Sequence, residues 1–300
     1  MKIFDLGVAW NCEQDTDFVK ELNNCALKEG LKPYLIHAYN FYGTLKDIAE
    51  NHIWFPFFLD RTVNDGTPLC EVGDFFKRRS TVFINYPDRV RKLLNRYKIY
   101  LEPITYNISL PARILLKPQD NRHILELKIK YLSSPFLLKS VGDLPNAGIN
   151  LGAKSIDDIL RLREQYGNIA YIAQEKIEPM ILDKKYASFR NVYCLGDIIS
   201  SWWHPADNVY EILTQHDIDK LKLDRLLSIS AKIARVSKLD FFLTEIVVDK
   251  NGDFLVTDQI NVHPDMHRKS KFNNGMPDEA VDRVIKNIIC SIKQKTRYDK

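Results

Sequence analysis

The sequence predicts a mixed α/β protein, with both α/β and α+β character, in which parallel and antiparallel sheets occupy different parts of the chain. A strand, a helix and a second strand follow one another in the first forty residues, which is typical of a parallel pair. Strands without an intervening helix dominate residues 179–210, and an Asn-Gly hairpin lies near the C-terminus, which indicates antiparallel pairing. At 300 residues the chain exceeds one average domain, so we expect two or three lobes.

The composition is that of an ordinary globular protein, with 45% hydrophobic and 27% charged residues. A net charge of +4 without a dense basic stripe argues against a nucleic-acid partner. The longest wholly apolar stretch, residues 54–59, is too short to span a membrane, and the N-terminus lacks the apolar run of a signal peptide. The five cysteines are odd in number and scattered, which favours reduced thiols and a cytoplasmic location over disulfides or a zinc site.

Residues 1–107 are expected to form an α/β lobe. Residues 2–10 read as a buried strand, a helix with one apolar face stops at Gly30, and residues 34–38 return as a strand. A basic amphipathic helix over residues 88–106 ends the lobe.

Asp60 and Arg61 follow another apolar strand of this lobe. They could form a salt bridge at the strand end or contribute to a substrate site, and the sequence does not choose between these two roles.

Residues 108–178 alternate between strands and helices. Lys139 ends an apolar strand, where a single ammonium group could meet a polyphosphate, although a lysine in such a place is more often simply exposed to solvent. In order, the segment contains a strand, a helix, the strand that ends at Lys139, a loop with three glycines, a capped helix and a strand, at residues 110–116, 121–132, 134–139, 141–152, 155–166 and 169–173.

Residues 179–300 begin with two antiparallel strands that turn at Gly196. Arg190 lies in the first strand, and burying its guanidinium would require an anion close by. Trp202 and Trp203 are adjacent in the second strand and must therefore face opposite ways. We expect one long helix over residues 216–237 and a closing amphipathic helix over residues 278–293.

The hairpin around Asn251-Gly252 carries one acid in each strand, Glu245 and Asp258. A two-residue type I′ turn would place these two carboxylates directly opposite each other, where they repel unless a cation lies between them. Mg²⁺ is the natural guest, and Asn261 could add a neutral oxygen ligand. Two alternatives stay open: both acids could simply face water, or a longer turn that starts at Asp249 could shift the pairing by one residue and separate them.

The succession of an acid, a hairpin, a second acid and Asn-x-x-Pro resembles the C-terminal signature of ATP-grasp enzymes. Asp258 stands three residues before Asn261, where the usual family pattern has two, but an ATP-grasp subgroup with Asp-x-x-Asn followed by Asp-Met/Leu-Arg-x-Lys-Ser is similar to residues 258–270 here. The resemblance implies an ATP-grasp fold with a pre-ATP-grasp lobe over residues 1–107, a small subdomain over 108–178 and a large subdomain over 179–300. It implies ATP and Mg²⁺ as cofactors.

The same resemblance assigns roles to individual residues. Metal ligands would be Glu245, Asp258 and Asn261, and Lys139 and Arg190 would act on the phosphates and the reacting groups. The nucleotide would further be held by Arg96 (with Lys98 as the nearest lysine), by an adenine-reading hinge and by a ribose ligand, with the hinge at Gln174, Glu175, Lys176 and Ile177 and the ribose at Asp183 or Glu178. Residues 141–152 would form the loop that closes over the phosphates.

The activity implied is an ATP-dependent ligase, in which ATP phosphorylates a carboxylate and an amine or similar nucleophile attacks the acyl phosphate. A small-molecule kinase and a non-catalytic nucleotide-binding protein are the alternatives. The partners implied are a small-molecule or peptide carboxylate and an amine acceptor, with neither nucleic acid nor membrane, and a homodimer stays open.

Overall fold

The computed structural model describes the chain except for residues 63–67, 78–79, 95–106, 142–149, 168, 205–208 and 299–300. The chain forms two compact units, each built from separate stretches of sequence. The first unit comprises Met1–Val90, Ser188–Glu245 and Gln259–Lys300, and the second comprises Arg91–Ala187 and Ile246–Asp258.

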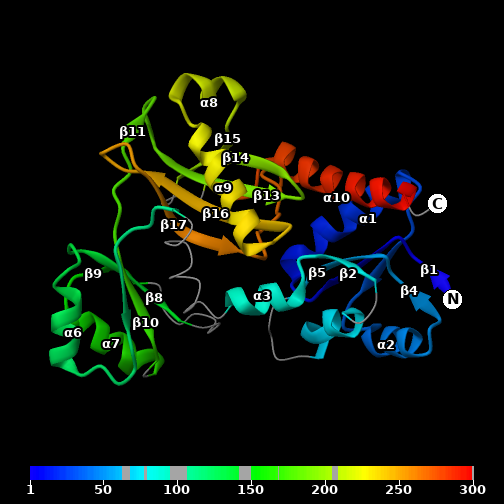
Figure 1. Ribbon diagram of the computed structural model, residues 1–300, viewed down its shortest axis with the longest axis horizontal. Helices are drawn as coiled ribbons and strands as arrows, with labels where there is room; N and C mark the ends of the chain where they lie inside the picture. Colours follow the sequence, from blue (N-terminus) through cyan, green and yellow to red (C-terminus); the bar gives the residue numbers. More distant parts are fainter. Residues whose placement is uncertain are drawn as a thin grey trace. The chain divides into compact units, whose positions relative to one another are not determined.

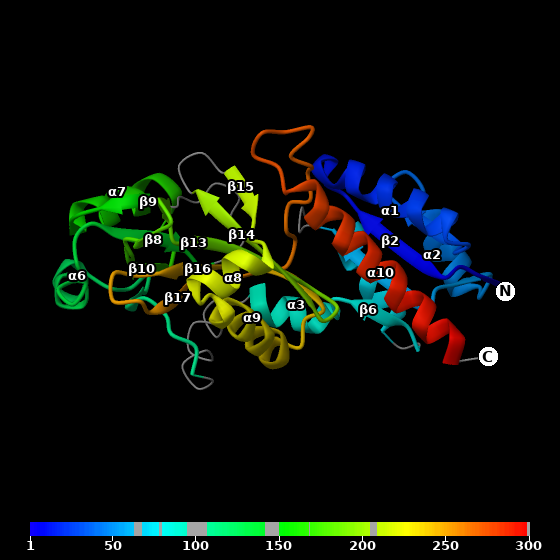
Figure 2. The same cartoon turned by 90° about the horizontal axis from the view of Figure 1, so that it is seen from above.

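A four-stranded parallel sheet opens the first unit, in the order β3-β2-β5-β6. The predicted parallel pair is present, because Leu6 to Ala9 of β2 pair with Pro33 to Ile36 of β3. Helix α1 packs beside the C-terminal helix α10 (Figure 2), and apolar residues of both helices share one core with the sheet. The bounds are β1 Lys2–Ile3, β2 Leu6–Trp10, α1 Thr16–Lys28, β3 Pro33–Ile36, α2 Phe41–Ala49, β4 Ile53–Trp54, β5 Phe57–Arg61, β6 Val82–Ile84, α3 Pro87–Leu94 and α10 Asp278–Tyr298.

A five-stranded sheet follows in the order β15-β14-β13-β16-β17 (Figure 1). Its pairs β13–β14 and β14–β15 are antiparallel, as predicted. Helix α9 lies against β13 and β14, where the side-chain amide of Asn191 donates to Leu226 O at 3.1 Å and to Ser230 Oγ at 2.9 Å. The bounds are β13 Ser188–Cys194, β14 Asp197–His204, β15 Val209–Ile212, α8 Gln215–Leu221, α9 Asp224–Ser237, β16 Phe241–Val248 and β17 Phe254–Asn261.

The single helix predicted over residues 216–237 is wrong, since two helices, α8 and α9, occupy this stretch. Lys222 takes a left-handed conformation with φ 56°, and Leu223 N donates back to Ile218 O at 2.9 Å. This bond across a left-handed residue is how many helices end, although glycine is the usual residue there.

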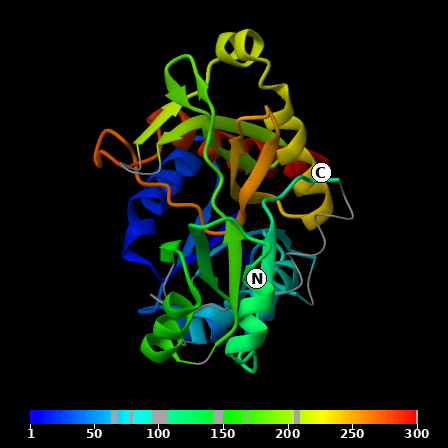
Figure 3. The ribbon, with the colours of Figure 1, turned by 90° about the vertical axis from the view of Figure 1, so that its left-hand side faces the viewer.

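The second unit contains a four-stranded sheet in the order β7-β10-β8-β9, and its pairs are antiparallel. Helices α6 and α7 lie on one side of it (Figure 3), where they share a core with the alternate strand residues Leu116, Leu138, Tyr171 and Ala173. The predicted capped helix is present as α7, with Ser155 as its N-cap. The bounds are β7 Arg113–Leu116, α6 Arg122–Ile129, β8 Phe136–Ser140, β9 Asn150–Ala153, α7 Ile156–Tyr166, β10 Tyr171–Glu175, β11 Ile181–Leu182 and β12 Lys185–Tyr186.

The turn between β16 and β17 is the longer of the two alternatives. Gly252 N donates to Asp249 O at 3.0 Å, Asp249 N donates to Asp253 O at 3.0 Å, and only Gly252 of the turn has a positive φ, at 81°. The predicted two-residue type I′ turn is therefore wrong. Asp249 faces Asp253, whereas the predicted turn would have paired it with Phe254, so the turn does not set Glu245 directly opposite Asp258.

Arg61 forms a salt bridge, but its partner is Asp15 and not its neighbour Asp60. The Arg61 and Asp15 side chains are 1% and 8% exposed, and Arg61 Nε donates to Asp15 Oδ2 at 3.2 Å. The guanidinium also donates to Pro264 O at 2.8 Å and lies over the rings of Phe18 and Phe241. The ion pair therefore joins the end of β5 to the start of α1, and the hydrogen bond to Pro264 O ties the same guanidinium to the segment that follows β17.

Asp60 is a half-buried carboxyl at the end of β5. Its Oδ1 accepts from the backbone N of Thr62 at 2.9 Å and from the Thr62 hydroxyl at 2.7 Å. Burial raises the pKa of Asp60 to about 6, against the Thr62 hydrogen bonds, which lower it. Because the folded-state pKa lies above the unfolded one, the contribution of Asp60 to stability is complete below about pH 4 and is lost as pH rises through about 6.

Asp60→Asn is therefore expected to stabilise the protein at pH 8, by at most about 3 kcal/mol, and to leave stability nearly unchanged at pH 4. Urea unfolding of wild type and variant at the two pH values measures this difference. A stability difference that is the same at pH 4 and pH 8 would contradict the raised pKa.

None of the helices in the described part of the chain is both long and apolar enough to cross a membrane.

Candidate functional site

The small sheet of the second unit has one apolar face and one polar face. In the register of its strands Gln174 lies opposite Arg113, and Ile172 lies opposite Lys139. Side chains alternate along a strand, so Arg113, Gln174 and Lys139 point away from the face that packs on α6 and α7. The sheet therefore presents two cations and one amide together on the side that faces away from α6 and α7.

These three side chains meet at the middle of β17, within the same unit. Thr257 O accepts from Lys139 Nζ at 3.0 Å, from Gln174 Nε2 at 3.3 Å and from Arg113 Nη2 at 3.4 Å. Lys139 Nζ also lies 3.8 Å from Asp258 Oδ1. The structure thus brings together Lys139, the predicted phosphate ligand, and Asp258, a predicted metal ligand.

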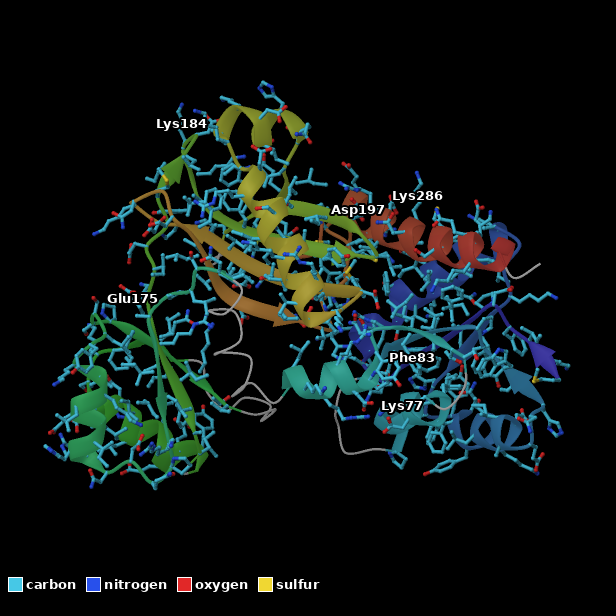
Figure 4. The ribbon with its side chains drawn as sticks, in the orientation of Figure 1. Lys77, Phe83, Glu175, Lys184, Asp197 and Lys286 are labelled. Carbon is cyan, nitrogen blue, oxygen red and sulfur yellow. The ribbon has the colours of Figure 1, made fainter. Side chains whose placement is uncertain are left out.

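Gln174 is the most buried member of the predicted adenine hinge. It is 0% exposed, and its Oε1 is buried without a hydrogen-bond partner among the described residues. Strand β10 continues through Glu175 (Figure 4), whose N donates to Ala112 O at 2.9 Å, so the strand runs two residues further than predicted. Lys176 is exposed and pairs with Glu178 at 3.7 Å, and Ile177 follows it outside any strand.

Asp183, the predicted ribose ligand, lies at the tip of the β11–β12 hairpin. Asp183 and Lys184 (Figure 4) both have positive φ, at 46° and 66°, as a type I′ turn requires. Its role at a ribose stays a prediction.

Arg190 lies in β13 at the centre of a cluster in the first unit. Its Nη2 is 2.6 Å from Glu245 Oε1, its Nη1 donates to the Tyr210 hydroxyl, and its guanidinium carbon lies 3.7 Å from the centre of the Trp203 ring. Although burial alone would lower it, Glu245 and Tyr210 hold the pKa of Arg190 above its ordinary value, and burial raises the pKa of Tyr210. Glu245 is thus the anion that Arg190 requires on burial.

The start of β16, the strand of Glu245, is fixed by Asn85 at the end of β6. Asn85 Nδ2 donates to Phe241 O at 2.6 Å, and its Oδ1 accepts from Asp240 N at 2.8 Å and Phe241 N at 2.9 Å. A side-chain amide that forms hydrogen bonds with three backbone groups holds the start of the strand in place. Sequence analysis did not identify this contact.

The three predicted metal ligands supply carboxylate and amide oxygens, which suit Mg²⁺. The Asp258 side chain is 59% exposed, while Glu245 is 15% exposed and bonded to Arg190. Asn261 is exposed, and its Oδ1 accepts from His263 N at 2.9 Å. Among the described residues no three His, Cys, Asp or Glu side chains form a cluster suited to a metal. Of the three predicted ligands, Asp258 is the one that has a lysine, Lys139, beside it.

The segment that resembles Asp-Met-Arg-x-Lys-Ser forms contacts inside the first unit. Arg268 bonds Glu21 and Asp282, at 2.6 Å each, and Lys269 Nζ donates to Tyr210 O at 2.5 Å. These cations serve to fasten the segment to α1, α10 and β15.

Three predictions fall outside the described residues. They concern Arg96, its alternative Lys98, and the body of the predicted phosphate loop at residues 142–149.

Comparisons with known proteins find similarity in structure. No protein-family model matches the sequence, and no curated protein matches it. The structure is similar to that of a RimK domain ATP-grasp protein from Sphaerobacter thermophilus, with 17% identity and TM-score 0.63 over 95% of this chain and 98% of the other. It is similar to D-alanine–D-alanine ligase from Bacillus anthracis complexed with ATP, with 13% identity and TM-score 0.66 over 99% of both chains. It is also similar to the ATP-grasp ligase PsnB complexed with a phosphomimetic variant of its minimal precursor, Mg and ADP, with 13% identity and TM-score 0.63 over 95% of this chain and 99% of PsnB.

Proposed function

We propose that this chain, which has the ATP-grasp fold over nearly its whole length, is an ATP-dependent ligase that joins a carboxylate to an amine or similar nucleophile. The observation that carries the proposal is the polar face of the small sheet, where Lys139 lies between the backbone of β17 and the exposed carboxylate of Asp258. Solved structures with this fold include ligases bound to ATP or to Mg and ADP, which supports the same reading.

In the proposed reaction an oxygen of the substrate carboxylate bonds to the γ-phosphorus of ATP, and the bond to ADP breaks. The nucleophile then attacks the acyl carbon of the acyl phosphate and releases inorganic phosphate. Catalysis of phosphoryl transfer consists chiefly of positioning and of neutralising charge. Lys139 would bind phosphate oxygens. Arg190, held in place by Glu245 and Tyr210, would orient the reacting groups.

Glu245, Asp258 and Asn261 would hold Mg²⁺ on the nucleotide. When bound, that ion supplies charge neutralisation for the polyphosphate. Gln174 to Ile177 would contact the adenine, with Asp183 near the ribose, and Arg96 would add a phosphate contact.

The test is release of ADP and phosphate across panels of acids and amines. Release that needs both an acid and an amine supports the ligase. Release with a single acceptor and no amine would indicate a kinase, and binding of Mg-ATP without any release would indicate a non-catalytic nucleotide-binding protein.

Lys139→Met is expected to weaken the binding of a non-hydrolysable ATP analogue by about 10- to 100-fold, because a hydrogen bond to a charged group contributes about 1.5–3 kcal/mol. Isothermal titration calorimetry measures the affinity. Lys154→Met is the matched control, since Lys154 is exposed and directly follows β9 in the same unit. This variant should bind the analogue as the wild type does. Equal affinities for Lys139→Met and wild type would remove Lys139 from the phosphate site.

A further inference from the structure

The carbonyl oxygen of Thr257 accepts hydrogen bonds from more side chains than it has lone pairs. A carbonyl oxygen has two lone pairs, and Lys139, Gln174 and Arg113 all donate to this one. One donor can therefore leave without stranding the oxygen. Arg113 and Lys139 each have a second contact near Thr257, and these second contacts indicate different roles for the two cations.

Arg113 spans two successive peptide groups of β17. Its Nη2 donates to Val256 O at 2.9 Å as well as to Thr257 O at 3.4 Å. Val256 N in turn donates to Ser109 O at 3.0 Å, four residues before Arg113 in the chain. The segment that leads into β7 therefore holds this part of β17 by both its donor and its acceptor groups.

A peptide group is planar, so hydrogen bonds that hold Thr257 O restrain the plane that also contains the nitrogen and the Cα of Asp258. Holding that oxygen limits where the Asp258 carboxylate can lie. We infer that Arg113 is a positioning residue that sets Asp258 for its metal through the backbone of β17. The inference rests on the proposed function, because it concerns the metal ligand of that same site.

Lys139 is suited to the complementary role. It lies 3.0 Å from Thr257 O and 3.8 Å from Asp258 Oδ1, and its ammonium is a compact charge on a flexible stem. Turning toward a phosphate costs Thr257 O only one of its donors, and Arg113 keeps the strand in place. Arg113 therefore affects metal binding by positioning Asp258, while Lys139 binds the phosphates of the nucleotide.

The test compares Arg113→Leu and Arg113→Lys with wild type in calorimetric titrations of a non-hydrolysable ATP analogue, once with Mg²⁺ and once with EDTA. The quantity of interest is the gain in affinity that Mg²⁺ brings. Arg113→Leu should lose about 10- to 100-fold of this gain, the range found when groups that orient metal ligands are removed, and its affinity in EDTA should stay that of wild type. Arg113→Lys should retain part of the gain, because one ammonium can still reach a carbonyl.

Arg163→Lys is the matched control, since Arg163 also donates to two backbone carbonyls of the second unit, Asp120 O at 2.9 Å and Lys117 O at 2.6 Å. It should keep the full Mg²⁺ gain. An unchanged gain in Arg113→Leu would overturn the inference, and so would an equal loss with Mg²⁺ and with EDTA, which would place Arg113 on the nucleotide itself. If Arg113→Leu does not fold, Arg113→Lys decides: a partial loss of the Mg²⁺ gain supports the inference, and an unchanged gain overturns it. Failure of the wild type to bind the analogue with Mg²⁺ would instead count against the proposed function.

Discussion

Replacing Asp258 with asparagine is expected to abolish ATP turnover and to leave the protein folded. The change removes the charge that would hold the metal on the phosphates, and such neutralisation contributes several kcal/mol to phosphoryl transfer, so turnover should fall by about 100-fold or more. Folding should be unaffected, because the side chain is 59% exposed and its contact with Lys139 spans 3.8 Å. ADP release, measured beside a urea unfolding curve, checks both statements.

Asp253→Asn is the matched control for this experiment, because Asp253 is exposed on the same hairpin. It should turn over ATP as the wild type does. Full activity of Asp258→Asn would show that the carboxylate holds no essential metal. Glu245 is a less direct probe, since its carboxylate neutralises Arg190, and its removal would leave a largely buried cation without its anion.

Asp15→Asn is expected to destabilise the protein by about 3–5 kcal/mol, because it leaves the Arg61 charge buried without a carboxylate. Arg61 is 1% exposed, so water cannot replace the lost partner. The effect should be a large fraction of the stability of a typical domain, which lies at about 5–15 kcal/mol. Urea unfolding gives the free energy of unfolding of each variant.

A second variant separates the charge from the packing. The double variant Asp15→Leu with Arg61→Met removes both charges and should recover much of the stability lost by Asp15→Asn, since apolar pairs often replace buried ion pairs without loss. Asp157→Asn breaks an exposed pair with Arg122 and should change stability little. If Asp15→Asn also had only this small effect, the pair would contribute little to the fold.

The parts of the fold that were predicted correctly are those specified by local sequence. The β13–β14 hairpin turns at Leu195 and Gly196, which both have positive φ, at 52° and 99°, and the strands have nearly the bounds expected. Helix α7 begins after Ser155, whose capping box with Asp158 satisfies the helix start, and it ends before Gly167, whose φ of 90° does not continue a helix. The mixed α/β class and the ATP-grasp fold followed from the order of such elements and are confirmed.

The turn before β17 was predicted wrongly because a neighbouring side chain competes with the Asn-Gly signal. Asp249 Oδ1 accepts from Asn251 N and from Asp253 N, at 2.9 Å each, and these bonds stabilise the longer turn. An aspartate side chain that accepts from the backbone N–H two residues later commonly stabilises a turn. The sequence therefore supported both the two-residue turn and the longer one.

The candidate site was predicted only in part because some of its contacts join residues far apart in sequence. Lys139 and Asp258 were proposed as site residues from strand ends and from the family resemblance, but Arg113 had no signal of its own. Its contact with β17 spans 143 residues, and an arginine near the start of a strand is otherwise unremarkable in a sequence. Likewise Arg61 has its partner 46 residues away in Asp15, so inspection of neighbouring residues suggested Asp60.

The cations of residues 268–271 bear on how acceptor compounds should be chosen. The basic side chains of this segment bond groups of their own unit: Arg268 bonds Glu21, Lys269 bonds Tyr210 O and Lys271 bonds Asp17. Their presence in the sequence is therefore no evidence that the segment binds acidic ligands. A screening library weighted toward polyanionic molecules on the strength of that sequence would be biased without cause. A chemically even set of carboxylates and amines gives every class of acceptor the same opportunity to be detected.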